Sequence, residues 1–266
     1  MRKIVLFVVL AFVFTWAWWV PLAVAGVVVE PGQGWPTHLP GLLGPALAAV
    51  VVTAATEGRA GLAELWSRVT RWRVSWIWYL LVVATAALAL TGLVLTPGAT
   101  PPDLLVYSGA PEIGLALVLY VLVVNGFGEE IGWRGFLAHR LLETRSTVAT
   151  AVLVWLVWGV WHLPMFWVVG SFRDFGIAGT VGWTVGLGLG SVFLTWLYRT
   201  SGRSVLVTAL WHTAYNLTTA TAATAGTTAV VTSSVVMVAA VVVLLRRSSW
   251  QDVRRHRGTN AAVADL

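Results

Sequence analysis

Three short polar runs interrupt sequence that is otherwise apolar, and their residue types suit hydrolytic chemistry. The side chains concerned are Glu129, Glu130 and Arg134 in the first run, His162 in the second, and His212 and Asn216 in the third. Carboxylate, imidazole and amide groups in one site can activate a water molecule and stabilise an oxyanion. Because a charged side chain inside a membrane costs several kcal/mol, such groups point to a functional site.

Helical spacing separates the roles of these side chains. Glu130 and Arg134 are at positions i and i+4, so they share a helix face and can form an ion pair that neutralises both charges. Glu129 is rotated by about 100° around the helix axis from Glu130, so it is not expected to pair with Arg134. His212 and Asn216 have the same i, i+4 spacing, which places an imidazole and a carboxamide one turn apart on one face.

The three runs are expected at similar depths in the membrane. A count from the nearest arginine at about 1.5 Å per residue puts Glu129 roughly 16 Å, His162 roughly 20 Å and His212 roughly 13 Å from the arginine-rich surface. We therefore treat the runs as one site. Two structural alternatives are that the glutamates are interfacial charges of a shorter helix and that His162 is a hydrogen-bonded core residue.

The composition is typical of a membrane protein. Of the 266 residues, 58% are hydrophobic and only 11% are charged, whereas soluble domains carry about 25% charged residues. The net charge of +6 comes from basic residues in short connections between apolar runs, where they orient a membrane protein, so we predict no nucleic-acid partner. The absence of cysteine excludes disulfides, thiolate metal sites and a cysteine nucleophile.

Eight apolar segments are long enough to cross a bilayer, since a helix of about 20 residues spans a hydrocarbon core about 30 Å thick. Their continuous apolar character favours helices, so the sequence predicts an all-α polytopic membrane helix bundle of about eight transmembrane helices. A cleaved signal peptide is an alternative for the first segment, although its apolar run exceeds the roughly 7–15 residues of such signals. The expected spans are Ile4–Ala25, Leu39–Thr56, Trp76–Thr96, Ile113–Leu137, Val148–Val169, Ile177–Tyr198, Val205–Ala222 and Thr227–Leu245.

The basic residues predict the orientation. If eight helices alternate in direction, every arginine-rich connection falls on one side and the acidic connections on the other, which places both termini in the cytoplasm. We expect a multi-pass protein of the bacterial plasma membrane, the inner membrane. Residues 57–75 are predicted to be either an amphipathic helix on the inner leaflet or a basic loop. The expected domains are a transmembrane domain at 1–245, with its motif core at 128–216, and a disordered cytoplasmic polar tail at 246–266.

The three runs, in this order, resemble the signature of the CPBP family of intramembrane proteases, the CAAX-processing and bacteriocin-processing enzymes also called the Abi family. The resemblance also includes Leu43-Gly44-Pro45 at the start of the second span. Each motif alone is weak, whereas three in order at similar depth are specific. The matching motifs are Glu129-Glu130-x-x-x-Arg134, an aromatic-x-x-x-His formed by Trp158 and His162, and His212-x-x-x-Asn216.

The resemblance implies an endopeptidase that cleaves membrane-embedded or membrane-anchored peptides or proteins in the lipid bilayer. Carried over to this chain, Glu129 is the general base that activates water, and His162 helps to hold that water. His212 and Asn216 stabilise the tetrahedral oxyanion, while the acid–arginine pair of the first motif sets geometry and charge. No cofactor is expected.

Zinc is the alternative cofactor, because family members have also been described as metalloproteases. Its ligands here would be Glu129, His162 and His212, which include residue types that bind zinc in proteins.

Several other functions are alternatives to a glutamate-dependent protease. The sequence has no His-Glu-x-x-His and no intramembrane aspartate pair, which argues against the zinc site-2 and aspartyl types. A serine type built on Ser191 leaves the two glutamates unexplained. A catalytically inactive membrane scaffold or immunity protein and a proton-coupled transporter stay open as alternatives, although the paired broken helices of a transporter are not found.

Overall fold

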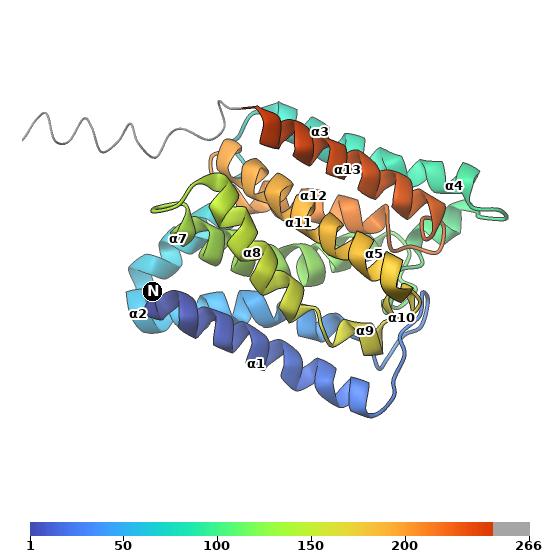
Figure 1. The fold of residues 1–266 in the computed structure, drawn as a ribbon, viewed down its shortest axis with the longest axis horizontal. Coiled ribbons are helices and arrows are strands. Elements are labelled where there is room, and N and C mark those ends of the chain that lie inside the picture. Colours follow the sequence, from blue (N-terminus) through green and yellow to red (C-terminus); the bar gives the residue numbers. More distant parts are fainter. Residues whose placement is uncertain (247–266) are drawn as a thin grey trace, which may run out of the picture.

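The computed structural model describes residues 1–246, which form a bundle of helices (Figure 1). Most of the expected polar tail, residues 247–266, lies outside the described residues. Within the described part, seven helical segments are long and apolar enough to cross a membrane. The pairing between extended segments there is limited to isolated bridges. The predicted all-α polytopic bundle is confirmed, and the chain is a multi-pass membrane protein.

The seven spans lie where seven of the predicted segments were placed. Several spans consist of two or more consecutive helical elements. The spans are α1 (Arg2–Val24); η1 (Leu39–Leu43) with α2 (Gly44–Val69); α3 (Trp76–Ala87), η2 (Leu88–Thr91) and α4 (Gly92–Leu95); α5 (Ala116–Val121), η4 (Leu122–Phe127), α6 (Gly128–Glu130), η5 (Ile131–Ala138) and α7 (His139–Leu141); α8 (Thr147–Trp161) with α9 (Met165–Val168); α11 (Gly176–Thr200); and α13 (Thr227–Leu245).

The remaining predicted span, Val205–Ala222, is present as the shorter helix α12 (Val205–Leu217). Its 13 residues correspond to a length of about 20 Å, less than a hydrocarbon core of about 30 Å. Turns follow the helix as far as Gly226, and α13 begins at Thr227. Because most of the α12 side chains are buried, α12 is an inner helix that carries the third motif. Two short elements, η3 (Pro101–Leu105) and α10 (Gly170–Arg173), lie in connections.

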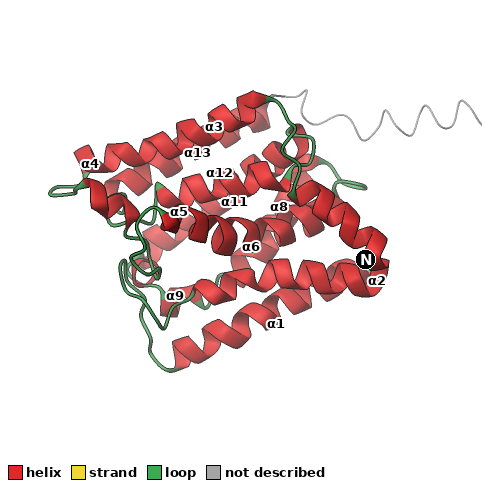
Figure 2. Ribbon diagram, turned by 180° about the vertical axis from the view of Figure 1, so that it is seen from behind, coloured by secondary structure: helices red, strands yellow, loops and turns green. Residues whose placement is uncertain are grey.

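The helices lie in layers, with their axes roughly along one direction. Figures 1 and 2 show α1 and α2 along one side of the bundle and α3 and α13 along the opposite side, with α8, α11, α12 and the span from α5 to α7 between them. α1 packs on α2, α8 on α11, and α11 on α13. The motif-bearing helices therefore lie between the two outer pairs of helices.

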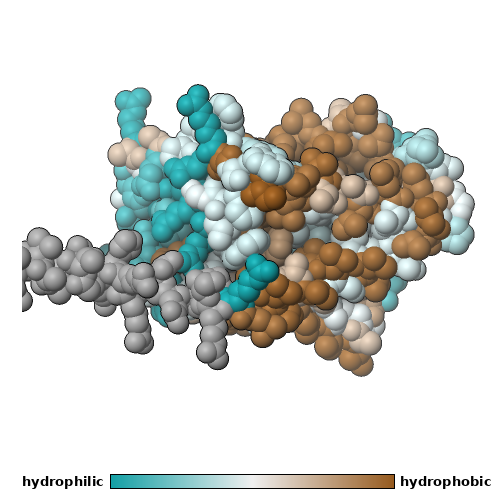
Figure 3. Space-filling model, turned by 90° about the horizontal axis from the view of Figure 1, so that it is seen from above, coloured by the Kyte–Doolittle hydropathy of each residue, from teal (hydrophilic) through white to brown (hydrophobic). Residues whose placement is uncertain are grey.

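Polar connections gather at the two ends of the bundle. At one end, Glu57 accepts hydrogen bonds from Lys3 at 3.2 Å and from Arg140 at 2.5 Å, which joins α1, α2 and α7. Figure 3 shows hydrophilic residues gathered at one end of the molecule, next to a hydrophobic band. At the other end, isolated bridges hold the loops together: Val29 with Val169, Pro31 with Ser108, and Tyr107 with Thr221.

Helix α2 bends at Gly58, whose φ of 62° and ψ of −153° lie outside the helical region. A residue with a side chain is strained at this positive φ, so glycine suits the break. The half after the bend is helical up to Val69, and it buries Leu65, Arg68 and Val69 against the bundle. Residues 57–69 are therefore helical, as one of the two predictions for residues 57–75 states, while a position on the inner leaflet stays a prediction.

Candidate active site

The two adjacent glutamates lie on α6, a single turn between two π-helical segments, η4 and η5. Local π-helix is frequent at functional sites. Glycine lets this turn approach η1 and α2 closely: a Cβ on Gly128 would lie 2.8 Å from the Leu42 carbonyl oxygen, and one on Gly132 would lie 2.7 Å from that of Pro45. The glutamate turn is thus held against the start of the second span.

Glu130 is fully buried and holds two partners. Its Oε1 accepts a hydrogen bond from Arg134 at 2.8 Å and lies 2.9 Å from Nδ1 of His212. The guanidinium of Arg134 lies 4.7 Å from the centre of the Trp158 ring, a cation–π contact. The predicted ion pair between Glu130 and Arg134 is present. Glu130 also contacts His212, the histidine of the third motif.

Glu129 has different surroundings. Its side chain is 3% exposed, and its Oε2 accepts a hydrogen bond from the indole Nε1 of Trp158 at 2.6 Å. Among the described residues, no ion pair to Glu129 is formed. The two carboxylates are therefore distinct, since one is engaged by a cation and the other by a neutral donor.

His162 stands at the end of α8, in the cap position. Its Nδ1 lies 2.7 Å from the carbonyl oxygen of Trp158. Because a carbonyl only accepts hydrogen bonds, this contact requires a proton on Nδ1 and leaves Nε2 with a lone pair in the neutral imidazole. The ring packs among three indoles, with centroid distances of 5.5 Å to Trp158, 4.7 Å to Trp161 and 5.3 Å to Trp183.

Asn216 lies one turn beyond His212 on α12 and is partly buried. Its Nδ2 donates a hydrogen bond to the side-chain oxygen of Asn125 on η4. Asn125 in turn donates to the hydroxyl of Tyr107 at 3.5 Å. Burial is the main cause that raises the pKa of Tyr107, and the negative charge of Glu129 adds to it. The phenol therefore stays protonated.

The three motifs meet, as the estimate of their depths predicts. Trp158 contacts the other motifs: it donates to Glu129, it lies under Arg134, and its ring centroid is 5.7 Å from that of His212. Sequence reasoning treated Trp158 only as an aromatic of the second motif. It missed Asn125 as well, although an amide four residues before Glu129 in an apolar run was a usable signal.

The alternative zinc ligands were Glu129, His162 and His212. In the described part of the chain, no three His, Asp or Glu side chains stand close enough together to hold a metal ion. The two imidazoles each use Nδ1 within the protein. The alternative zinc ligands are therefore not assembled in this arrangement.

Comparison with known proteins identifies the same region. Residues 111–218 match the family of Rce1-like type II CAAX prenyl endopeptidases, a range that contains every predicted site residue. The curated CAAX prenyl protease 2 of Methanococcus maripaludis is 23% identical over 104 residues, which are 38% of this chain and 38% of that protein. The chain thus matches well under half the length of this relative. All three motifs lie inside the matched region, so this part of the chain is similar to CAAX prenyl endopeptidases.

Proposed function

We propose that this protein is an intramembrane endopeptidase in which Glu129 activates a water molecule for attack on a peptide bond. The single observation that carries this proposal is the difference between the two buried carboxylates. Glu130 is bound to Arg134 and His212, whereas Glu129 accepts only the neutral Trp158 N–H among the hydrogen bonds described. A carboxylate without a cationic partner is the better proton acceptor of the two.

The proposed reaction is hydrolysis. Glu129 takes a proton from water as the oxygen attacks the carbonyl carbon, and the tetrahedral oxyanion forms. Collapse of that intermediate breaks the C–N bond, and the proton held by Glu129 passes to the leaving amine. His162 would accept a hydrogen bond from the water through Nε2, since its Nδ1 is held by the Trp158 carbonyl.

The oxyanion would be stabilised from α12. His212, oriented through Nδ1 by Glu130, can donate from Nε2 when it is protonated, and Asn216 has a second amide N–H beyond the one used on Asn125. Preorganised donors of this kind contribute about 3–4 kcal/mol each to transition-state stabilisation.

The proposed substrate is a membrane-anchored protein or peptide cleaved close to the bilayer. Two observations support this class: the site is buried among membrane-spanning helices, and the matched family and the relative are named for CAAX prenyl endopeptidase activity. We also propose that the arginine-rich end faces the cytoplasm of a bacterial cell, which places both termini there.

The test compares Glu129→Gln with wild type on a farnesylated peptide that ends in a CAAX sequence, in detergent, together with the membrane peptides that accumulate in cells carrying each form. We expect Glu129→Gln to abolish cleavage at a near-normal melting temperature, because Gln keeps the shape of Glu but cannot accept a proton. Glu143→Gln, an exposed carboxylate at the end of the same span, is the matched control and should cleave normally.

Cleavage by the Glu129→Gln protein at the wild-type rate would show that another group is the base. If neither form changes the peptides in cells or cleaves the probe, the chain acts as a scaffold and the proposal is wrong.

A further inference from the structure

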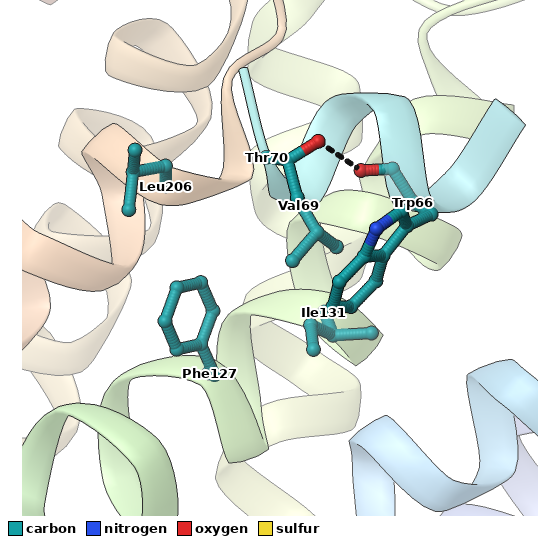
Figure 4. Close-up of a pocket in the computed structure, with 6 residues that line it drawn as sticks. All are labelled: Trp66, Val69, Thr70, Phe127, Ile131 and Leu206. Atoms are coloured by element: carbon teal, nitrogen blue, oxygen red, sulfur yellow. Dashed lines mark hydrogen bonds between the residues drawn. The ribbon is translucent and has the colours of Figure 1, made fainter. Parts of the chain in front are cut away.

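An apolar groove opens between the bent half of α2, the glutamate-bearing span and α12. Its volume is about 420 Å³, which is within the range of about 300–1,000 Å³ of small-molecule sites. Figure 4 shows side chains from all three elements around it, with the indole of Trp66 next to Ile131 and the Phe127 ring below Leu206. The lining residues are Trp66, Val69, Thr70, Phe127, Ile131 and Leu206.

The groove suits a hydrocarbon chain. Thr70 is its one lining residue with a hydroxyl, and that hydroxyl already donates to the Trp66 carbonyl at 3.0 Å. No lining side chain carries a charge. Apart from the Trp66 indole N–H, the lining offers no free side-chain partner to polar ligand groups, whereas buried CH₂ groups gain favourable transfer free energy.

Three arginines lie close in the sequence to residues that line this groove. Arg71 follows Thr70 directly, and its NH1 donates to the carbonyl of Gly202 at 2.5 Å. Ser204 donates in return to the Arg71 carbonyl at 2.6 Å. Arg203 lies in the same turn, which leads into α12 and so to Leu206. The turn is thereby fastened to the end of α2, beside the groove.

Within residues 1–246, these arginines form no ion pair with an acidic side chain. Among the described residues, the nearby acids pair elsewhere: Glu57 binds Lys3 and Arg140, and Glu64 binds Arg68. The hydrogen bond of the Arg71 guanidinium goes to a carbonyl, and Arg73 stacks over the Trp72 ring at 5.0 Å. No ion pair involves Arg71, Arg73 or Arg203 in the part of the chain that the structure describes.

We propose that the groove binds an acyl chain of an anionic phospholipid, whose phosphate is held by Arg71, Arg73 and Arg203. The charge of the rim selects this occupant, because guanidinium groups recognise phosphate through charge-assisted hydrogen bonds. A prenyl or acyl anchor on a peptide would fill the apolar part but would bring no phosphate to the rim. The bound chain would also touch Phe127 and Ile131, which flank the two glutamates on the same helix.

The experiment measures binding of dioleoyl phosphatidylglycerol to the full-length protein in detergent by native mass spectrometry, with dioleoyl phosphatidylcholine as the neutral probe. Each arginine near a phosphate is worth about fivefold in affinity. We expect the triple variant Arg71→Gln, Arg73→Gln, Arg203→Gln to bind phosphatidylglycerol about 100-fold more weakly. Arg73→Gln alone should cost about fivefold, and it leaves the fold intact because this side chain is exposed.

Two further variants sharpen the result. Leu206→Trp fills the groove and should weaken phosphatidylglycerol binding with every arginine in place. Arg59→Gln removes an exposed arginine from the same half of α2, away from the groove lining, and should bind like wild type.

Three results would overturn the proposal. The first is equal binding of the two lipids by the wild-type protein. The second is unchanged phosphatidylglycerol binding by the triple variant or by Leu206→Trp. The third is a neutral farnesylated peptide that displaces phosphatidylglycerol equally from wild type and from the triple variant, which would assign the groove to the lipid anchor of a substrate.

Discussion

Nδ1 of His212 lies 2.9 Å from Oε1 of Glu130, the same oxygen that accepts a hydrogen bond from Arg134 at 2.8 Å. A neutral imidazole can donate to a carboxylate only if the proton is on that nitrogen, so the contact fixes the tautomer and turns Nε2 away from Glu130. Glu130 therefore positions a second motif while it neutralises a cation. We therefore expect variants of Glu130 and of Glu129 to differ when both folding and activity are measured.

Glu130→Gln should lower both stability and activity. The substitution leaves Arg134, which is fully buried, without its counter-charge, and breaking a buried pair from one side costs about 3–5 kcal/mol. We expect a clear fall in melting temperature in detergent, together with slow peptide cleavage. The double variant Glu130→Gln, Arg134→Gln should recover part of the melting temperature. If Glu130→Gln alone melts like wild type, the ion pair does not support the fold.

Trp158→Phe should impair cleavage more than it impairs folding. Phe keeps an aromatic face for Arg134 but removes the N–H that donates to Glu129 at 2.6 Å. A hydrogen bond to a charged group is worth about 1.5–3 kcal/mol, which corresponds to roughly 10- to 100-fold in rate if Glu129 is the base. Trp155→Phe on the same helix removes an N–H that donates to the Thr184 carbonyl, so it serves as the control. Equal rates for the two variants would argue against a role for the indole N–H.

Local spacing was sufficient for part of this site. The pair of Glu130 with Arg134 follows from an i, i+4 relationship, and it is present even though η5 is a π-helix. The crossing segments were predictable for the same reason, because length and apolar character are properties of each segment alone. The short length of α12 was not predictable in this way, since its apolar run continues into turns that the loops of one end hold in place.

Contacts between segments far apart in the sequence could not be predicted. Nothing in a single sequence indicates that the Trp158 indole, rather than a histidine, donates to Glu129, because that contact depends on how α8 packs against α6. The link from Asn216 to Asn125 likewise joins residues 91 positions apart. The roles of Glu129, His162, His212 and Asn216 in catalysis stay predictions that the variants above address.

Metal removal tests the glutamate mechanism. We expect peptide cleavage in detergent to survive thorough chelation, with no stoichiometric zinc in the purified protein, because Glu129, His162 and His212 do not form a metal-binding group as placed. Elemental analysis of the same sample provides the second measurement. A reversible loss of cleavage that added zinc restores would instead make these side chains ligands and would exclude Glu129 as a free base.

His38 should make the protein less stable at acidic pH. This side chain precedes the second span, and burial lowers its pKa from 6.5 to about 4. The folded chain then binds fewer protons than the unfolded chain, so stability is full above pH 6.5 and falls as the pH decreases toward 4. The slope is at most about 1.4 kcal/mol per pH unit. We expect the melting temperature of His38→Gln to depend less on pH across this window than that of wild type, and parallel curves would contradict the assignment.

Cysteine labelling tests the orientation, and the chain has no native cysteine to interfere. Ser67 lies on the bent half of α2 near the arginines, Ser171 lies on α10 at the opposite end, and both are exposed. Because basic connections stay in the cytoplasm, a membrane-impermeant maleimide should reach Ser171→Cys in intact cells. It should reach Ser67→Cys only in inverted vesicles. The reverse pattern would place the arginine-rich end outside, and the anionic lipid that we propose for the groove would then have to come from the outer leaflet of that membrane.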